Sequence, residues 1–296
     1  MKNFKNHPLL EITNWIDQEL RENKTLSFQV LNPDTNEKAK GYKIWVNLAE
    51  LHFCKMLTPE KIDNESVKIT FQKLNKDDSF HSAPIENREE KYGVDSKFFN
   101  INKNEEPTFL HAYKKALEAV KIQNRKQVLN LGINKGDEFE LIAQLLEEET
   151  FQKIKLIGID HSQTALEFAK QRFSTENIEF YKQDINTIET LKLKKSDLII
   201  SIGTLQSPSI NYKPFLMSLV QEHLTQDGAF ILGFPNSRWI DGELIYGAKA
   251  PNYPYSEMSL IFNDVIFAKK YLQQKKFRVT ITGREYIFLT ATRIGI

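Results

Sequence analysis

The sequence contains a single cysteine, Cys54, among 296 residues. One cysteine excludes an internal disulfide framework and a cysteine-rich zinc site. The spacing typical of metal ligands is also missing from four of the histidines, His52, His81, His111 and His223. No metal site is therefore predicted.

Charge of one sign and long apolar runs are both scarce. The formal net charge is +1, which gives no global basic field of the kind that dominates binding to a polyanion. No stretch is apolar enough over the length of a bilayer, and residues 1–8 lack the apolar run of a signal peptide. We expect a cytoplasmic protein without a membrane partner, and the oligomeric state is left open.

Changes in composition along the chain predict three parts. Residues 1–75 read as a small accessory α/β segment, with helices over 9–22 and 45–56 and strands over 26–31 and 67–74. Residues 76–106 are rich in polar residues and read as a linker or lid. Its aromatics either close over a ligand or fix the segment to the domain: Tyr92, Phe98 and Phe99. Residues 107–296 form the main domain.

The main domain alternates helices with short apolar strands, which predicts a parallel sheet covered on both faces. The last two strands, 277–282 and 286–292, are joined by only three residues, so they must be antiparallel neighbours. The predicted fold is α/β, with a doubly wound, mostly parallel seven-stranded sheet and an antiparallel terminal strand. The small N-terminal α/β segment precedes it.

Three strand ends carry residues suited to a nucleoside ligand. The strand 128–131 leads into a turn that begins at Gly132 and ends at Gly136, where glycine permits tight geometry and close ligand approach. Asp160 ends the second strand, where a carboxylate can accept hydrogen bonds from both ribose hydroxyls. Asp184 and the backbone amide of Ile185 follow the third strand and suit an adenine edge. These ends meet at one edge of a parallel sheet.

With these motifs, residues 105–296 resemble the class I S-adenosylmethionine-dependent methyltransferases. The segment 128–136 looks like that family's first motif, 157–160 like its second and 197–205 like its fourth. The resemblance implies S-adenosylmethionine as cofactor and a methyl-transfer activity. It also implies a set of cofactor-binding residues: Asn130, Gly132, Asn134, Gly136, Asp160, His161, Asp184, Ile185, Ser201 and Gly203.

Two residues depart from the family's first motif. Asn130 stands where the strand-end acid is common, and Asn134 stands at the middle glycine of the loop. Asparagine tolerates left-handed backbone, so the loop geometry is retained. The negative charge near the sulfonium is reduced, and Asp137 or Glu138 at the next helix start either compensates for it or serves the helix N-terminus.

The sequence narrows the choice of methyl acceptor only by excluding some classes of substrate. The segment 202–208 is not the Asn/Asp-Pro-Pro-aromatic signature of family members that methylate exocyclic base amines, which leaves a small molecule or a group on modified tRNA as the favoured acceptor. Residues 234–255 combine aromatics and charges after the fifth strand and are the predicted acceptor wall. In it, Arg238 is a candidate clamp for an anion, and Asp241 or Glu243 a candidate base.

Two other functions fit part of the pattern. An NAD(P)-dependent oxidoreductase also uses a glycine turn and a strand-end acid. The antiparallel terminal pair and the weak glycine pattern argue against it. A non-catalytic S-adenosylmethionine-binding protein is the second alternative, because Asn130 and Asn134 alter the first motif.

Overall fold

A computed structural model describes residues 1–75, 90–96, 98–240, 243–246, 248–249, 256–257 and 259–295. The chain divides into two compact units. The first contains residues 1–83 and 239–246, and the second contains residues 84–238 and 247–296. Each unit is described by itself.

The first unit is a small sheet with helices. Its elements are β1 (Lys2–Asn3), α1 (Leu9–Glu22), β2 (Thr25–Leu31), α2 (Tyr42–Leu51), β3 (Cys54–Met56), β4 (Glu60–Lys61) and β5 (Ser66–Lys73), together with the later strand β12 (Glu243–Tyr246). The sheet order is β1-β2-β5-β3, with β4 also paired to β5. Apolar residues alternate along β2 and point into a core around Phe28 and Trp45, both fully buried.

The predicted helix over 45–56 is wrong in its second half. Helix α2 ends at Leu51, and Phe53 then adopts a positive φ of 55° that no helix accommodates. Cys54 begins strand β3 and is buried, and burial raises the pKa of its thiol to about 11. Cys54 therefore acts as a small hydrophobic core residue.

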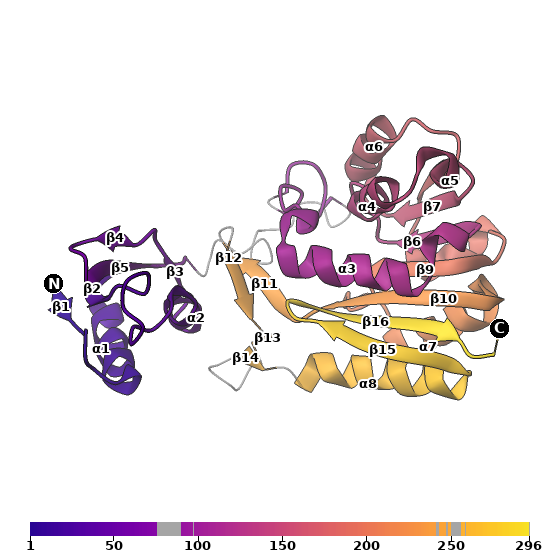
Figure 1. The fold of residues 1–296 in the computed structure, drawn as a ribbon. Helices are drawn as coiled ribbons and strands as arrows, with labels where there is room; N and C mark the ends of the chain where they lie inside the picture. The colour runs from indigo at the N-terminus through magenta and orange to yellow at the C-terminus, as the bar shows by residue number, and fades with distance from the viewer. Residues whose placement is uncertain are drawn as a thin grey trace. The chain divides into compact units, whose positions relative to one another are not determined.

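The second unit is built on a seven-stranded sheet (Figure 1). Its order is β15-β16-β10-β9-β6-β7-β8. The last strand of the chain, β16, runs antiparallel to both of its neighbours, β10 and β15, as the short connection before it requires. This confirms the predicted fold class. The strands are β6 (Gln127–Leu131), β7 (Lys155–Asp160), β8 (Ile178–Lys182), β9 (Ser196–Ile202), β10 (Leu224–Pro235), β15 (Phe277–Gly283) and β16 (Tyr286–Arg293).

Helices cover both faces of this sheet, and each face has its own apolar core (Figure 1). Helices α3 (Pro107–Ala119) and α4 (Asp137–Leu145) pack on one face, and α7 (Tyr212–Ser218) and α8 (Ser259–Gln274) on the other. Side chains of β6 alternate between the two cores, with Val128 on the α3 and α4 side and Leu129 on the other. No helix in the described chain has the length and apolar character needed to cross a membrane.

Eight further elements belong to the second unit. They are η2 (Lys103–Glu105), η3 (Ile122–Asn124), α5 (Glu148–Gln152), α6 (Gln163–Arg172), η4 (Ile185–Leu191), η5 (Leu219–His223), β13 (Ala248–Lys249) and β14 (Ser256–Glu257). Strand β11 (Ser237–Ile240) lies at the division between the units and pairs with β12.

Candidate cofactor site

The loop after β6 turns sharply over the edge of the sheet. Gly132 has φ +78°, and a β-carbon at this position would lie 2.0 Å from the Thr204 hydroxyl, so only glycine fits. Gly136 has φ +91° and lies against the ring of Phe173. Asn134 also has a positive φ, 48°, which asparagine tolerates better than most residues. The loop therefore keeps a glycine-type geometry with asparagine at its middle position.

Asp160 holds this loop in place from the end of β7. Its Oδ2 accepts a hydrogen bond from the Asn134 amide at 2.8 Å, and its Oδ1 accepts one from the Ser162 amide at 3.0 Å. The residue is only 5% exposed. Each carboxylate oxygen retains a second lone pair, so Asp160 can also accept hydrogen bonds from two ligand hydroxyls.

The other candidates on β7 and β8 lie further out. His161 is exposed, with its Nδ1 3.5 Å from Asp160 Oδ1. Asp184 is also exposed, and its Oδ1 accepts a hydrogen bond from the Asn186 amide at 2.9 Å, which caps η4. Ile185 is buried beside it. The described chain thus brings Asp160, Asp184 and the loop after β6 to the carboxyl ends of three neighbouring strands.

Ser201 and Gly203 take internal positions at β9. The Ser201 hydroxyl is buried and donates to the Leu131 carbonyl at 3.2 Å, so it links β9 to the end of β6. The Gly203 amide donates to the Gly233 carbonyl at 2.8 Å. A β-carbon on Gly203 would lie 3.5 Å from the hydroxyl of Tyr286, which begins β16. Tyr286 therefore reaches the carboxyl end of β9.

Part of the predicted lid packs onto this edge. Glu90 caps helix α6: its carboxylate accepts hydrogen bonds from the Ser162 hydroxyl at 2.8 Å, the Gln163 amide at 2.8 Å and the Thr164 hydroxyl at 2.5 Å. Burial raises the pKa of Glu90, but the hydrogen bonds from Thr164 and Ser162 outweigh burial and lower it. The carboxylate is thus held ionised at the positive end of the helix.

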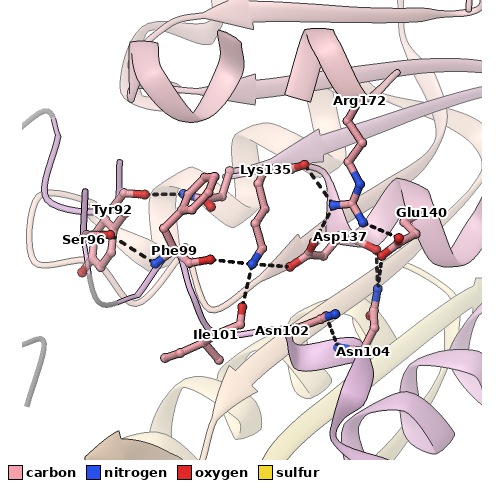
Figure 2. Close-up of polar contacts among 11 residues, drawn as sticks. Tyr92, Ser96, Phe99, Ile101, Asn102, Asn104, Lys135, Asp137, Glu140 and Arg172 are labelled. Atoms are coloured by element: carbon pink, nitrogen blue, oxygen red, sulfur yellow. Dashed lines mark hydrogen bonds and ion pairs between the residues drawn. The ribbon is translucent and has the colours of Figure 1, made fainter. Parts of the chain in front are cut away.

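The segment 90–101 also contacts the loop after β6 directly (Figure 2). The Asn134 side chain donates to the Tyr92 carbonyl at 2.7 Å. Lys135 Nζ donates to the carbonyls of Phe99 at 2.5 Å and Ile101 at 2.9 Å. The described part of this segment is therefore fixed to the loop after β6 through the side chains of Asn134 and Lys135.

The aromatic side chains of the segment pack against the domain. The Phe99 ring is buried and meets the Phe168 ring of α6 edge-on at 5.0 Å. Tyr92 and Phe98 make a similar contact with each other at 5.0 Å. Two roles were predicted for these aromatics, and Phe99 has the second: it fixes the segment to the domain.

Asp137 and Glu138, the two candidates for compensating charge, have different surroundings. Asp137 forms ion pairs with Arg172 at 2.8 Å and Lys135 at 3.7 Å, and Arg172 also pairs with Glu140 (Figure 2). Its charge is therefore directed toward cations of the loop and α6. Glu138 instead points into the domain and is 5% exposed.

Glu138 lies close to the half-buried side chain of Lys103. Burial raises the pKa of Glu138 to about 7, although the Lys103 ammonium opposes this rise. Burial likewise lowers the pKa of Lys103, but its interaction with Tyr286 and the charges of Glu138 and Asp137 outweigh burial and raise it. Lys103 Nζ lies 5.5 Å from the centre of the Tyr286 ring.

Asn130 is the most unusual residue of the site. It is 1% exposed, and neither its Nδ2 nor its Oδ1 has a hydrogen-bond partner among the described residues. Buried polar groups are nearly always paired, because an unpaired one carries the full cost of desolvation. The unpaired amide near the end of β6 is therefore available to a polar group of a ligand.

The predicted acceptor wall falls largely outside the described part of the chain. Asp241 is not among the described residues, and neither are the side chains of Arg238 and Glu243. Among the described residues, no group of three or more histidine, cysteine, aspartate or glutamate side chains is placed to hold a metal ion.

Three residues of the site escaped sequence reasoning. Glu90 and Lys103 stand in a polar segment without periodicity, and Tyr286 reads as an ordinary strand residue. Their partners are distant in sequence, as Glu90 and Ser162 are by 72 positions. The one available signal for Lys103 is its position just before Pro107, which begins α3, the first helix of the predicted main domain.

A family model described as a methyltransferase domain matches residues 122–278, which is more than half of the chain. No curated protein sequence matches. Solved structures with a similar fold include the N-methyltransferase NodS from Bradyrhizobium japonicum WM9, solved in complex with S-adenosyl-L-homocysteine. NodS is 16% identical with a TM-score of 0.46, over 69% of this chain and 94% of NodS.

Two further structures are similar in the same way. The methyltransferase domain of bacterial CtHen1 is 18% identical with a TM-score of 0.46, over 62% of this chain and 99% of that domain. Coclaurine N-methyltransferase, solved with N-methylheliamine and SAH, is 23% identical with a TM-score of 0.36. In that case the match covers 42% of this chain and 35% of the coclaurine enzyme.

The family match confirms the predicted enzyme class over the oxidoreductase alternative, and the sheet order agrees with it. This chain belongs to the methyltransferase-domain family, the Rossmann-like class I methyltransferases that depend on S-adenosylmethionine.

Proposed function

We propose that this enzyme binds S-adenosylmethionine across the ends of β6, β7 and β8 and methylates a small molecule or a group on modified tRNA in the cytoplasm. One observation carries the cofactor placement. Asp160 is buried at the end of β7, fixes the loop after β6 through the Asn134 amide, and still has lone pairs for hydroxyl donors. A carboxylate at this place suits the two ribose hydroxyls of a nucleoside.

The remaining contacts follow from the strand order. The glycine turn lets the backbone approach the cofactor, with Gly132 and Gly136 in conformations that other residues rarely adopt. Asp184 and the amide of Ile185, at the end of β8, are assigned to the adenine, and His161 to the rim beside the ribose. Tyr92, 6.5 Å from the His161 ring, extends this rim from the segment 90–101.

Methyl transfer requires little covalent participation by the protein. The cofactor supplies a methyl group on a positively charged sulfur, and transfer requires that the acceptor atom lie in line with the bond that breaks. An alcohol or ammonium acceptor must also lose a proton, whereas an anionic acceptor needs no base. Arg238 is assigned to anchoring an anionic acceptor, and Asp241 or Glu243 to accepting a proton.

The favoured acceptor classes rest on charge and motif. A net charge of +1 gives no extended basic field, so a small molecule, or a single group presented by folded tRNA, suits the chain better than long nucleic acid. The segment 202–208 lacks the signature for exocyclic base amines.

Cofactor binding is tested by calorimetric titration of the purified protein with S-adenosylmethionine, S-adenosylhomocysteine and NAD. We expect saturable binding of the first two, at least about tenfold weaker in Asp160→Asn, which keeps the shape of the side chain but loses its charge. Asp95→Asn, an exposed change in the same unit, is the matched control. Binding of NAD alone, or of none of the three, would overturn the placement.

The acceptor is tested by incubating the enzyme with S-adenosylmethionine labelled on its methyl group and a cell extract split into small-molecule, RNA and protein fractions. Label in the first or second fraction supports the proposal. Label only in protein contradicts it, and cofactor binding without label anywhere favours the non-catalytic alternative.

A further inference from the structure

Three polar side chains belong to elements around the carboxyl end of β6: Asn130 on the strand itself, Glu138 on α4 and Lys103 on η2. Asn130 projects from β6 on the same face as Val128, the face covered by α3 and α4. Glu138 lies in the first turn of α4, and Lys103 lies just before α3. Helix α4, which follows the loop after β6, thus carries an anion, and η2, which precedes α3, carries the cation that faces it.

The charges of these side chains are paired only in part. Lys103 lies between aromatic rings, with its Nζ 5.3 Å from the centre of Phe98 and 5.5 Å from that of Tyr286. The Tyr286 hydroxyl hydrogen-bonds with its ammonium, which has three donors in all. Glu138 faces the same ammonium, and its neighbour Asp137 is engaged with Arg172.

Asn130 adds an amide that a purely structural ion pair between Lys103 and Glu138 would not require. Its amide offers donors and an acceptor, and all are buried without a partner among the described residues. Such a group carries the cost of desolvation while it is unpaired, and a ligand that pairs with it would remove this cost. The three side chains thus offer one cation, one anion and one amide that can both donate and accept.

The strand order indicates which part of the cofactor reaches the carboxyl end of β6. The sheet runs β8, β7, β6 and β9, and the adenine and ribose are assigned to the ends of β8 and β7. The part of the cofactor beyond the ribose therefore extends toward β6. In S-adenosylmethionine that part ends in an α-amino acid, which carries an ammonium and a carboxylate.

We infer that Lys103, Glu138 and Asn130 bind the amino-acid end of S-adenosylmethionine. Lys103 donates to the carboxylate, Glu138 accepts from the ammonium, and the Asn130 amide satisfies its free donors and acceptor on the same zwitterion. This inference rests on the proposed cofactor placement and deepens it.

The assignment explains the altered first motif. The acid that Asn130 replaces at the end of β6 is supplied instead by Glu138 in the first turn of α4. The cation comes from η2, which follows the segment 90–101. Lys103, which precedes the predicted main domain of residues 107–296, is then part of the cofactor site and contributes one of its charges.

The experiment compares S-adenosylhomocysteine with 5′-methylthioadenosine, which has the same nucleoside and sulfur but no amino-acid end. Calorimetry is run on the full chain and on Lys103→Met and Glu138→Gln, which remove each charge and nearly preserve the volume. Lys115→Met on α3 and Glu149→Gln on α5, both exposed, are the controls.

We expect the wild type to bind S-adenosylhomocysteine at least about tenfold more tightly than methylthioadenosine. Each site variant should lose at least about tenfold toward S-adenosylhomocysteine and stay within about threefold toward methylthioadenosine, while the controls match the wild type. Retained methylthioadenosine binding also shows that a variant is folded. If a single variant loses methylthioadenosine binding, the double variant with Lys103→Met and Glu138→Gln is measured in its place, because it leaves neither charge unpaired.

The outcomes separate the two proposals. A wild type that binds neither ligand overturns the cofactor placement, and this inference with it. A wild type that binds both ligands equally, or site variants that bind S-adenosylhomocysteine as the wild type does, overturn the inference alone.

Discussion

The two halves of the proposed cofactor site are built differently. On the ribose side, Asp160 is already hydrogen-bonded to two backbone amides, and Glu90 to the start of α6. On the β6 side, Asn130 is buried without a partner among the described residues, and Glu138 is a buried carboxyl that faces the half-buried ammonium of Lys103. The first half is complete without a ligand, whereas the second lowers its free energy when a ligand supplies the missing partners.

The largest effect on this comparison is expected from Asp160→Ala. The change leaves two amides of the loop region without their acceptor, so we expect the free energy of unfolding to fall by about 3 kcal/mol and nucleoside binding to be lost. Urea denaturation and titration with S-adenosylhomocysteine measure the two effects. Asp160→Asn, which keeps an acceptor oxygen, should recover part of the stability. An Asp160→Ala protein with wild-type stability would contradict the role of Asp160 in holding the loop after β6 in place.

The next effect is a pH dependence at Glu138. Burial raises the pKa of this carboxyl to about 7 from 4.5, so the folded protein keeps its proton at pH values where the unfolded chain has lost it. The contribution of Glu138 to stability must then be fully present below pH 4.5, fall by about 3 kcal/mol in total as pH rises through about 7, and level off only above that pKa.

Glu138→Gln removes this titration. The difference in unfolding free energy between variant and wild type, measured by urea denaturation across that pH window, should therefore shift in favour of the variant as pH rises. Glu149→Gln, at an exposed position, should give a constant difference. Parallel curves for Glu138→Gln and wild type would show that the carboxyl is not perturbed by burial.

A smaller effect with the opposite sign is expected at Asn130. Replacing the unpaired amide with leucine should raise the unfolding free energy of the ligand-free protein by about 1 kcal/mol and weaken S-adenosylhomocysteine binding. Ser201→Ala is the matched comparison on the neighbouring strand, because its hydroxyl is buried but paired with the Leu131 carbonyl. It should lower stability by about 1 kcal/mol. If both changes act in the same direction, the contrast between paired and unpaired groups fails.

The smallest effect is expected at the helix cap. Glu90→Gln retains a hydrogen-bond acceptor but removes the negative charge at the start of α6, which should cost about 0.5 to 1 kcal/mol. Hydrogen exchange should become faster at the amides of Gln163 and Thr164. Asp95→Asn, in the same segment, should leave that exchange unchanged, and an unchanged rate in Glu90→Gln would remove Glu90 from the capping role.

The loop and strand ends around Asp160 could be predicted from sequence, and the surroundings of Asn130 could be predicted only in part. The glycine turn, Asp160 and the antiparallel last strand follow from local patterns, because strand ends and short connections leave a direct trace in the sequence. Asn130 was recognised as a departure and Glu138 as a candidate for compensating charge, but their burial and the contact of Glu138 with Lys103 depend on how the helices pack.

The misplaced end of α2 has a similar cause. The apolar residues of 45–56 suit a helix, but the left-handed Phe53 and the pairing of Cys54 with β5 end it early. Pairing between distant strands overrides local propensity. Neither this pairing nor the contacts of Glu90 and Lys103 leave a periodic trace.

The most direct measurement is a crystal structure of the full chain with S-adenosylhomocysteine. We predict the ribose hydroxyls on Asp160, the carboxylate of the homocysteine on Lys103 and its ammonium on Glu138, with the Asn130 amide paired. A nucleoside bound away from Asp160 would contradict the cofactor placement. An amino-acid end directed away from Lys103 and Glu138, with Asn130 still unpaired, would contradict the division of the site into a complete and an incomplete half.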